Sequence, residues 1–214
     1  MKLVDVHMIT IPNQNQQWKQ QCLDSLVGHP VVLHEVDGVF GDIRESRRRG
    51  FMQGTSPYVS FVDPDDFVGA DAFRRCIVEL NKYPNICGAY TLSNQITVDD
   101  DGNDIRTELL HPFRQWPLPQ RGWLLEIHQL VVMRRECVQY VYDHFYDEIP
   151  KMHHTEVWMY WNMAMRAPWR AVDLVGYNWR VHGAGAHKMT TKAEMETAKR
   201  TAKYVSDIRR TLFA

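Results

Sequence analysis

Three carboxylates lie within four positions at the end of an apolar run. Residues 58–62 are apolar or β-prone, and Asp63, Asp65 and Asp66 follow them directly. This pattern is typical of a buried strand that ends in a turn. Carboxylates so close together raise one another's pKa unless a cation neutralises them. Hard oxygen ligands on a short turn favour Mg²⁺ or Mn²⁺, which complete their coordination with water and substrate phosphates.

The same acids have a second interpretation, as the start of a helix. Asp is a common N-cap residue, and apolar residues at helical spacing follow at Phe73, Ile77 and Leu80. On this interpretation Asp65 or Asp66 caps the helix and binds no metal. The local motif alone does not decide between a metal ligand and a cap.

A run of arginines precedes this strand. Arg44, Arg47, Arg48 and Arg49 lie in a segment, 40–54, that has the character of a helix with one basic face. Charge runs usually form a solvated surface. Here the segment joins two predicted strands that both end in acids, where an anionic ligand bound with a metal would need basic partners. The sequence therefore favours a functional role for some of these arginines.

The composition indicates one α/β domain. A chain of 214 residues with 44% hydrophobic content can bury a sizeable core. Its formal net charge of −1 argues against a strongly basic nucleic-acid binder. The four cysteines form no CxxC pair, which predicts neither a zinc site nor a disulfide framework. No apolar run approaches the ~20 residues that span a bilayer, so we expect a soluble, cytoplasmic protein.

Strand and helix patterns alternate along the chain. We expect strands over 3–11, 31–36, 58–62, 86–98, 124–133 and 171–181, and helices over 14–26, 40–54, 73–83, 138–145, 155–164 and 191–213. The first strand, helix and strand form a βαβ unit. The acids at 99–101 do not match the spacing of a calcium loop, and we expect them at a solvated hairpin tip. The proline-rich segment 111–122 is predicted to be a loop.

The order of these motifs resembles the GT-A glycosyltransferases, particularly the family 2 type. The resemblance rests on four segments, namely Ser46-Arg47-Arg48-Arg49-Gly50, the strand into Asp63-Pro64-Asp65-Asp66, the Thr155-Glu156 helix start and the closing Trp179-Arg180-Val181-His182. It covers about residues 1–190. It implies a single domain with a mixed sheet flanked by helices.

The family's architecture also implies how the chain is divided. Residues up to about 98 would form the nucleotide-binding half, and residues from about 99 to 190 the acceptor-side half. Residues 191–214 would add a C-terminal helix.

The resemblance implies roles for the donor side of the site. Asp63-Pro64-Asp65 matches the family's DxD signature, so Asp65 would bind the metal directly and Asp63 would lie nearer the ribose or donor sugar. Arg47 would contact the nucleotide, although Arg48 stands where the family usually has Asn. The nucleoside would be held by the loop and acids after the first two strands, namely Ile11, Pro12, Asn13, Glu35 and Asp37.

The resemblance also implies a general base and a second metal ligand. Glu156 would be the base, at a place where the family usually has an acidic pair and this chain has Glu156-Val157. It would take the proton of an acceptor hydroxyl. His182 would complete the shell of Mn²⁺ or Mg²⁺, with His187 as the second choice. Arg180 would help to stabilise the departing diphosphate.

The implied activity is a metal-dependent, inverting transfer of a sugar from a nucleotide-sugar donor, a UDP-sugar by resemblance, to an acceptor hydroxyl. The acceptor stays open among a glycan, a lipid-linked sugar, a protein side chain and a hydroxymethylated base in DNA. Six basic against three acidic side chains in the C-terminal helix motivate the DNA alternative, although a solvated helix would look the same.

Two other classes of function remain open. A non-catalytic sugar- or nucleic-acid-binding module on the same fold would tolerate the missing second acid at Val157. A nucleotidyltransferase would need a basic or glycine-rich loop after the first strand, and residues 12–15 contain neither Gly nor Lys.

Overall fold

The computed structural model describes residues 3–99, 101–110, 127, 129–152 and 155–182. The expected C-terminal helix over 191–213, the proline-rich segment 111–122 and His187 lie outside the described residues. Within the described part of the chain, no helix is long and apolar enough to cross a membrane.

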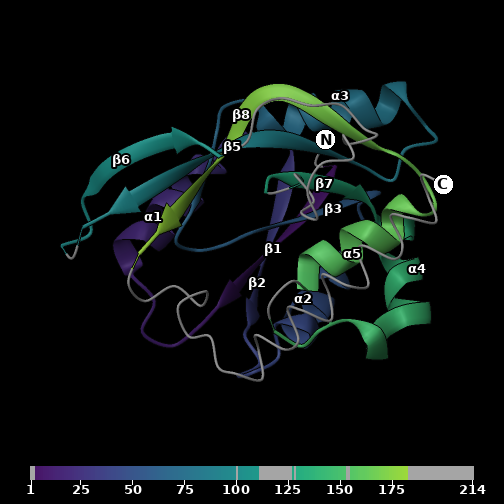
Figure 1. Cartoon of the computed structure of the whole chain (residues 1–214), viewed down its shortest axis with the longest axis horizontal. Helices are drawn as coiled ribbons and strands as arrows, with labels where there is room; N and C mark the ends of the chain where they lie inside the picture. Colours follow the sequence, from purple (N-terminus) through teal and green to yellow (C-terminus); the bar gives the residue numbers. More distant parts are fainter. Residues whose placement is uncertain (1–2, 100, 111–126, 128, 153–154, 183–214) are drawn as a thin grey trace.

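Strands and helices alternate over residues 4–62, as the sequence predicted, and strands follow one another directly in parts of the later chain (Figure 1). In chain order they are β1 (Val4–Thr10), α1 (Gln16–Ser25), β2 (Val31–Asp37), α2 (Ile43–Phe51), β3 (Tyr58–Val62), β4 (Phe67–Val68), α3 (Ala72–Lys82), β5 (Gly88–Val98), β6 (Asp104–Leu109), β7 (Val131–Arg134), α4 (Arg135–Phe145), the 3-10 turn η1 (Tyr146–Glu148), α5 (Thr155–Ala164) and β8 (Trp169–Val181).

One mixed sheet organises the molecule. Its strand order is β2-β1-β3-β7-β5-β8-β4, and β6 pairs with β5 beside this path. β1 runs parallel to both β2 and β3, which confirms the predicted βαβ unit, whereas β7 is antiparallel to β3 and β5. The carboxyl ends of β1, β2 and β3 therefore meet at one edge, where ligands of open α/β sheets collect.

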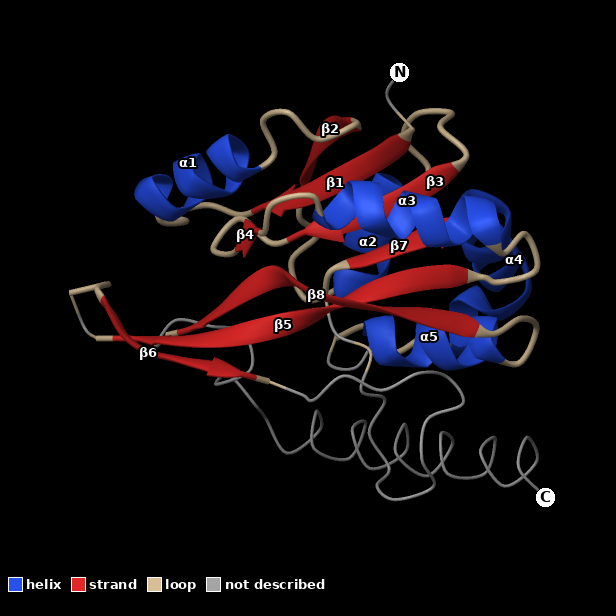
Figure 2. Cartoon of the chain, turned by 90° about the horizontal axis from the view of Figure 1, so that it is seen from above, coloured by secondary structure: helices blue, strands red, loops and turns tan. Residues whose placement is uncertain are grey.

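The two faces of the sheet carry separate hydrophobic cores. Phe51 of α2, Val138 of α4 and Met159 of α5 belong to one core. Cys22 of α1 and Phe73 of α3 belong to the other. The helices thus cover the sheet from both sides, with α1 and α3 on one face and α2, α4 and α5 on the other (Figure 2). The predicted mixed α/β fold in a single domain is confirmed.

Two of the predicted elements differ from the structure. The strand expected over 124–133 is correct only at its end, because β7 begins at Val131 and residues 124–126 and 128 lie outside the described residues. The helix-cap interpretation of Asp65 and Asp66 is wrong. Residues 67–68 form β4, and α3 begins only at Ala72. The three acids therefore lie on a connection between two strands.

Gly50 allows helix α2 to approach strand β1 closely. A Cβ atom at this position would lie 2.3 Å from Cγ of His7, and the His7 ring is fully enclosed between Phe51 and Phe61. We expect Gly50→Ala to lower the free energy of unfolding by about 1–3 kcal/mol, despite alanine's better helix propensity, because the helix must move away from the sheet. Urea denaturation measures this loss.

A matched alanine substitution separates packing from propensity. Gln17 lies on the exposed side of α1, and Gln17→Ala should change stability by no more than about 0.5 kcal/mol. A Gly50→Ala protein as stable as the unmodified chain would show that the helix can shift without loss.

Candidate active site

The turn after β3 is fixed from both sides. Asp66 N donates to Asp63 O at 3.1 Å, which closes the turn. Asp63 N donates to the hydroxyl of Tyr177 in β8 at 3.1 Å. β4 then pairs antiparallel with β8. These contacts place the acids of the turn beside the final residues of β8, more than a hundred positions later in the sequence.

Asp65 and His182 meet at this junction. Asp65 Oδ2 lies 2.8 Å from His182 Nε2, and both side chains are partly exposed, at 35% and 13%. The ring of Trp18 in α1 lies against His182, with ring centroids 4.8 Å apart. The two side chains expected to bind a metal are thus brought together, and Trp18 limits the movement of the imidazole.

The donor set fits a Mg²⁺ or Mn²⁺ ion only in part. In the described part of the chain, no group of three or more His, Cys, Asp or Glu side chains is arranged to hold a metal. Asp65 and His182 would supply two protein ligands. Mg²⁺ usually takes one or two carboxylates and fills its remaining positions with water and substrate phosphates. The pair therefore fits an ion that arrives with a diphosphate better than a permanently bound one.

Arg180 holds the turn from beneath. The residue is 3% exposed, its Nη1 donates to Asp65 O at 2.7 Å, and its guanidinium also contacts Gln21 of α1. Its backbone N donates to Asp66 Oδ1 at 2.8 Å. In this arrangement Arg180 is bound to protein oxygens. Its expected contact with a diphosphate stays a prediction.

Asp66 is buried without full hydrogen bonding. It is 1% exposed, and its Oδ2 finds no hydrogen-bond partner among the described residues. Burial, reinforced by the charges of Asp65 and Asp63, raises the pKa of the Asp66 carboxyl well above its usual range. Asp66 therefore joins the turn to β8 from inside the protein, while Asp65 points to the surface.

Arg47 connects the two halves of the site. Its Nη2 donates to Asp63 Oδ1 at 2.6 Å, and its Nε donates to Glu156 Oε1 at 2.8 Å. The guanidinium lies 3.8 Å from the centre of the Phe61 ring and is 5% exposed. Burial alone would lower the pKa of Arg47, but Asp63 and Glu156 raise it, so the side chain stays charged. The predicted nucleotide ligand and the predicted base are thus direct partners.

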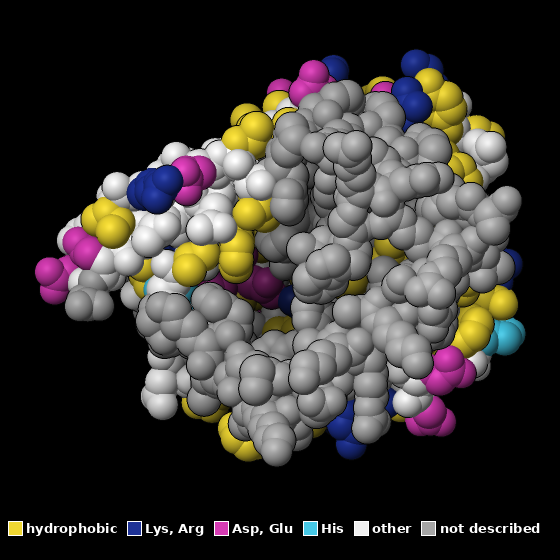
Figure 3. Space-filling model, viewed as in Figure 1, with side chains coloured by type: hydrophobic (Ala, Val, Ile, Leu, Met, Phe, Trp, Pro, Cys, Tyr) yellow, Lys and Arg dark blue, Asp and Glu magenta, His cyan; other side chains and the backbone are white. Residues whose placement is uncertain are grey.

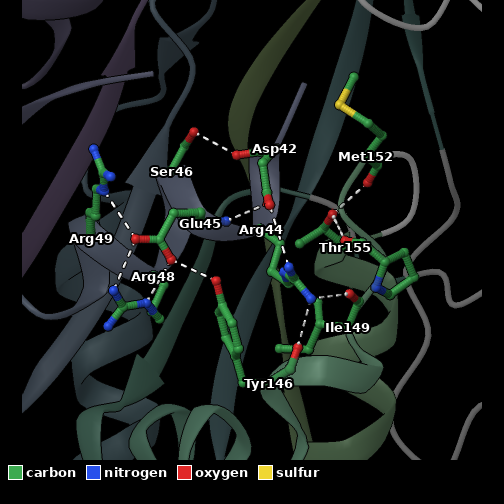
Figure 4. Close-up of polar contacts among 11 residues, drawn as sticks. Asp42, Arg44, Glu45, Ser46, Arg48, Arg49, Tyr146, Ile149, Met152 and Thr155 are labelled. Carbon is green, nitrogen blue, oxygen red and sulfur yellow. Dashed lines mark hydrogen bonds and ion pairs between the residues drawn. The ribbon is translucent and has the colours of Figure 1, made fainter. Parts of the chain in front are cut away.

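Contacts from α2 position the helix that carries Glu156. Arg44 N donates to Lys151 O at 3.1 Å, and Arg44 Nη1 donates to Tyr146 O at 3.2 Å and to Ile149 O at 3.4 Å (Figure 4). Thr155 Oγ1 donates to Pro150 O at 2.8 Å at the start of α5. The segment before α5 is therefore bound to α2, and Glu156 of α5 lies within hydrogen-bonding distance of Arg47 of α2.

The remaining arginines of the run do not enter the site. Arg48 Nε and Arg49 Nε donate to Glu45 at 2.8 and 3.0 Å, and Tyr146 donates its hydroxyl to the same carboxylate at 2.7 Å (Figure 4). The hydrogen bond from Arg48 is the main reason that the pKa of Glu45 falls to about 2. The predicted basic face thus divides, and among its arginines only Arg47 contacts Asp63 and Glu156.

The residues expected to hold the nucleoside lie at the carboxyl edge of the sheet. Ile11, Pro12 and Asn13 follow β1 and are exposed, and Asn13 has a left-handed backbone with φ of 62°. Asp37 ends the neighbouring strand β2, and Glu35 forms an ion pair with Lys19 at 2.6 Å. The structure places these residues at one edge, and their ligand stays a prediction.

Sequence reasoning missed two polar contacts of Asp63. Gln129 Nε2 donates to Asp63 Oδ2 at 3.2 Å, and the Tyr177 hydroxyl accepts from its backbone N. Both residues lie inside predicted strands, Gln129 in 124–133 and Tyr177 in 171–181, where no sequence pattern marks them as partners of Asp63. Together with Arg47 they fix Asp63 in one orientation.

The fold is similar to solved structures of S. aureus TarS. With TarS 1-349 in complex with UDP-GlcNAc, the TM-score is 0.60 at 10% identity, covering 88% of this chain and 61% of that one. With TarS 1-349 in complex with UDP, the TM-score is 0.56 at 12% identity, covering 84% and 60%. This chain thus spans about three fifths of TarS 1-349.

Because identity is only 10–12%, these similarities show the fold alone. No protein-family model and no curated protein matches the sequence. The predicted GT-A type of fold is confirmed, and the family 2 assignment stays a prediction.

Proposed function

We propose that the chain is a glycosyltransferase that takes its sugar from a nucleotide-sugar donor. The observation that carries this proposal is the contact of Asp65 and His182 at 2.8 Å, at the edge where β1, β2 and β3 end. This pair brings a carboxylate and an imidazole to the place where the fold collects ligands. Structural roles alone do not require an acid and a histidine to face each other at the surface.

The leaving diphosphate would bind at the Asp65–His182 pair. A Mg²⁺ or Mn²⁺ ion bound there would offset the negative charge that develops as the diphosphate departs. Arg47 binds Asp63, two positions before Asp65, and its Nη1 finds no hydrogen-bond partner among the described residues. That nitrogen is available for a phosphate or sugar oxygen once a donor displaces its surroundings, which agrees with the nucleotide role inferred from the resemblance.

Glu156 is the proposed general base. Its side chain is 23% exposed and lies across Arg47 from Asp63, so that a donor held at the strand ends and an acceptor above α5 would meet between them. The Glu156 carboxylate would take the hydroxyl proton as the hydroxyl oxygen attacks the anomeric carbon. The bond from that carbon to the nucleoside diphosphate would break on the opposite face, and this single displacement would invert the anomeric configuration. Arg47 would fix the Glu156 carboxylate in one orientation before the acceptor binds.

UDP is the proposed nucleotide. It is supported by the similarity of the fold to TarS, which has been solved with UDP-GlcNAc and with UDP. A glycan, a protein side chain and a hydroxymethylated DNA base remain acceptors to be tested. The main alternative is a non-catalytic sugar- or nucleic-acid-binding module, which Val157 favours because it occupies the position of the family's second acid.

Calorimetric titration with UDP, GDP, CDP and TDP, each with and without Mn²⁺, tests the proposal. We expect UDP to bind with a clear dependence on Mn²⁺. Asp65→Asn should weaken that binding by at least about tenfold, because even indirect partners of a metal contribute that much to its affinity. Asp71→Asn is the matched control, since this side chain is 71% exposed at the start of α3.

The outcomes separate the candidate functions. Metal-independent binding that survives Asp65→Asn would contradict the metal site and leave a binding module. If none of the four nucleotides binds under any condition, the transferase proposal fails, and only the fold is shared.

A further inference from the structure

Strand β6 projects from the molecule and is exposed on both faces. The β5–β6 hairpin extends beyond the rest of the described chain (Figure 2), and all six residues of β6 are exposed. Ile105 and Leu109 are 63% and 51% exposed, although both are large and apolar. Acidic, basic and hydrophobic side chains appear together on this projecting end (Figure 3). Such an exposed edge strand is a template for pairing with another chain.

The outer backbone edge of β6 offers regular hydrogen-bonding groups. Among the described strands, β6 pairs only with β5. Leu110 N donates to Ser93 O at 2.9 Å, so the alternation of an antiparallel ladder directs the backbone groups of Glu108 and Arg106 toward β5 as well. The N–H and C=O groups of Thr107 and Leu109 then point away from β5. Within the described part of the chain, these groups pair with no other strand and could take a further antiparallel one.

We propose that this edge pairs with the β6 edge of a second copy of the chain, around a two-fold axis at Thr107. In this register Thr107 faces its own copy, and Leu109 of the second copy faces Ile105, which lies at the bulge where the pairing of β6 with β5 shifts by one residue. On the other face Arg106 and Glu108 form an ion pair with each other along β6. In the dimer Arg106 also lies opposite Glu108 of the second copy, and the reverse pair forms as well. The pairing extends the sheet across two molecules.

The charge pattern selects this register over its neighbours. In an antiparallel dimer, residues whose backbone groups point away from β5 must lie opposite one another. The two-fold axis can therefore pass through a residue of β6, and the neighbouring registers have it at Arg106 or at Glu108. An axis at Arg106 would place Arg106 opposite its own copy, and Asp104 opposite Glu108. An axis at Glu108 would place that carboxylate opposite its own copy. Like charges directly opposite are destabilising, so of these three registers only the axis at Thr107 joins opposite charges and apolar residues together. An axis at Ile105 would set Asp104 opposite Arg106 but would leave Glu108 and Leu109 without partners in β6.

Charge exchange tests the pairing. In sedimentation experiments over a wide range of concentration, the unmodified chain should form a dimer. Arg106→Glu and Glu108→Arg should each raise the dimer Kd by about tenfold or more, because two opposite-charge pairs become like-charge pairs. The double variant should dimerise again. The two single variants, mixed, should form a heterodimer, since every pair across that interface is again of opposite sign.

Two further variants complete the design. Arg75→Glu makes the same change of net charge on the exposed surface of α3 and should leave the dimer unchanged. Thr107→Pro removes an outward N–H while keeping the ladder to β5, and should abolish the dimer without unfolding the chain, as circular dichroism can verify. A chain that stays monomeric at all concentrations would overturn the proposal. So would a dimer that ignores Arg106→Glu or is not restored by the double variant.

Discussion

Replacing Glu156 by glutamine is expected to lower kcat by about 10²–10⁴-fold, the usual contribution of a positioned general base. Glutamine keeps an oxygen that can accept the hydrogen bond from Arg47 Nε, now 2.8 Å from Glu156 Oε1, but it cannot take the acceptor's proton. Affinity for the nucleotide should remain. The measurement is release of nucleoside diphosphate from the donor under saturating conditions, beside calorimetric binding of the same nucleotide.

The matched control is Glu148→Gln. Glu148 is exposed in η1, shortly before α5. Its replacement by glutamine makes the same chemical change as Glu156→Gln, but away from Arg47. Its kcat should equal that of the unmodified protein. Full turnover in Glu156→Gln would exclude Glu156 as the base and direct attention to other groups near Asp63. Loss of nucleotide binding together with turnover would instead indicate that Glu156 only supports Arg47.

The strand ends of the site were predictable because the sequence marks them directly. The apolar run before Asp63 and Asp65 predicts both the strand and the residue at which it ends. Because β1 and β3 are parallel, their carboxyl ends lie at one edge of the sheet. The position of His182 came from a motif match rather than from spacing. Its approach to Asp65 depends on the antiparallel pairing of β4 with β8, which no local pattern contains.

The separate roles of the arginines were less predictable. Arg44 and Arg47 are three positions apart on α2 and both are buried, yet one binds backbone carbonyl groups and the other binds two carboxylates. The run identified a basic helix, but tertiary contacts assigned its members. Gln129 was missed for a related reason, since the strand expected around it begins only at Val131.

Arg47→Met is expected to lower the free energy of unfolding by about 3 kcal/mol, because it leaves Asp63 and Glu156 without the cation between them. Arg47 is the buried member of the group, at 5% exposed, while the two acids are 29% and 23% exposed, which places the loss at the lower end of the usual range. Urea denaturation measures it. Arg49→Met is the matched control, because that side chain is 51% exposed and should contribute no more than about 1 kcal/mol.

A double-mutant cycle isolates the contact between Arg47 and Glu156. In the Arg47→Met background, Glu156→Gln should cost less stability than it does alone, since it removes an acid that has lost its partner, and the coupling should reach about 0.5–3 kcal/mol. Strictly additive effects would contradict a stabilising ion pair.

Arg47→Lys tests whether the same contacts also matter for turnover. Lysine keeps the charge but cannot donate to Asp63 and Glu156 at once from a planar fork. Arg47→Lys should therefore lower kcat, because correct orientation of the base relative to the donor depends on both bonds. It should lower the free energy of unfolding less than Arg47→Met does, because the charge between the two acids is kept.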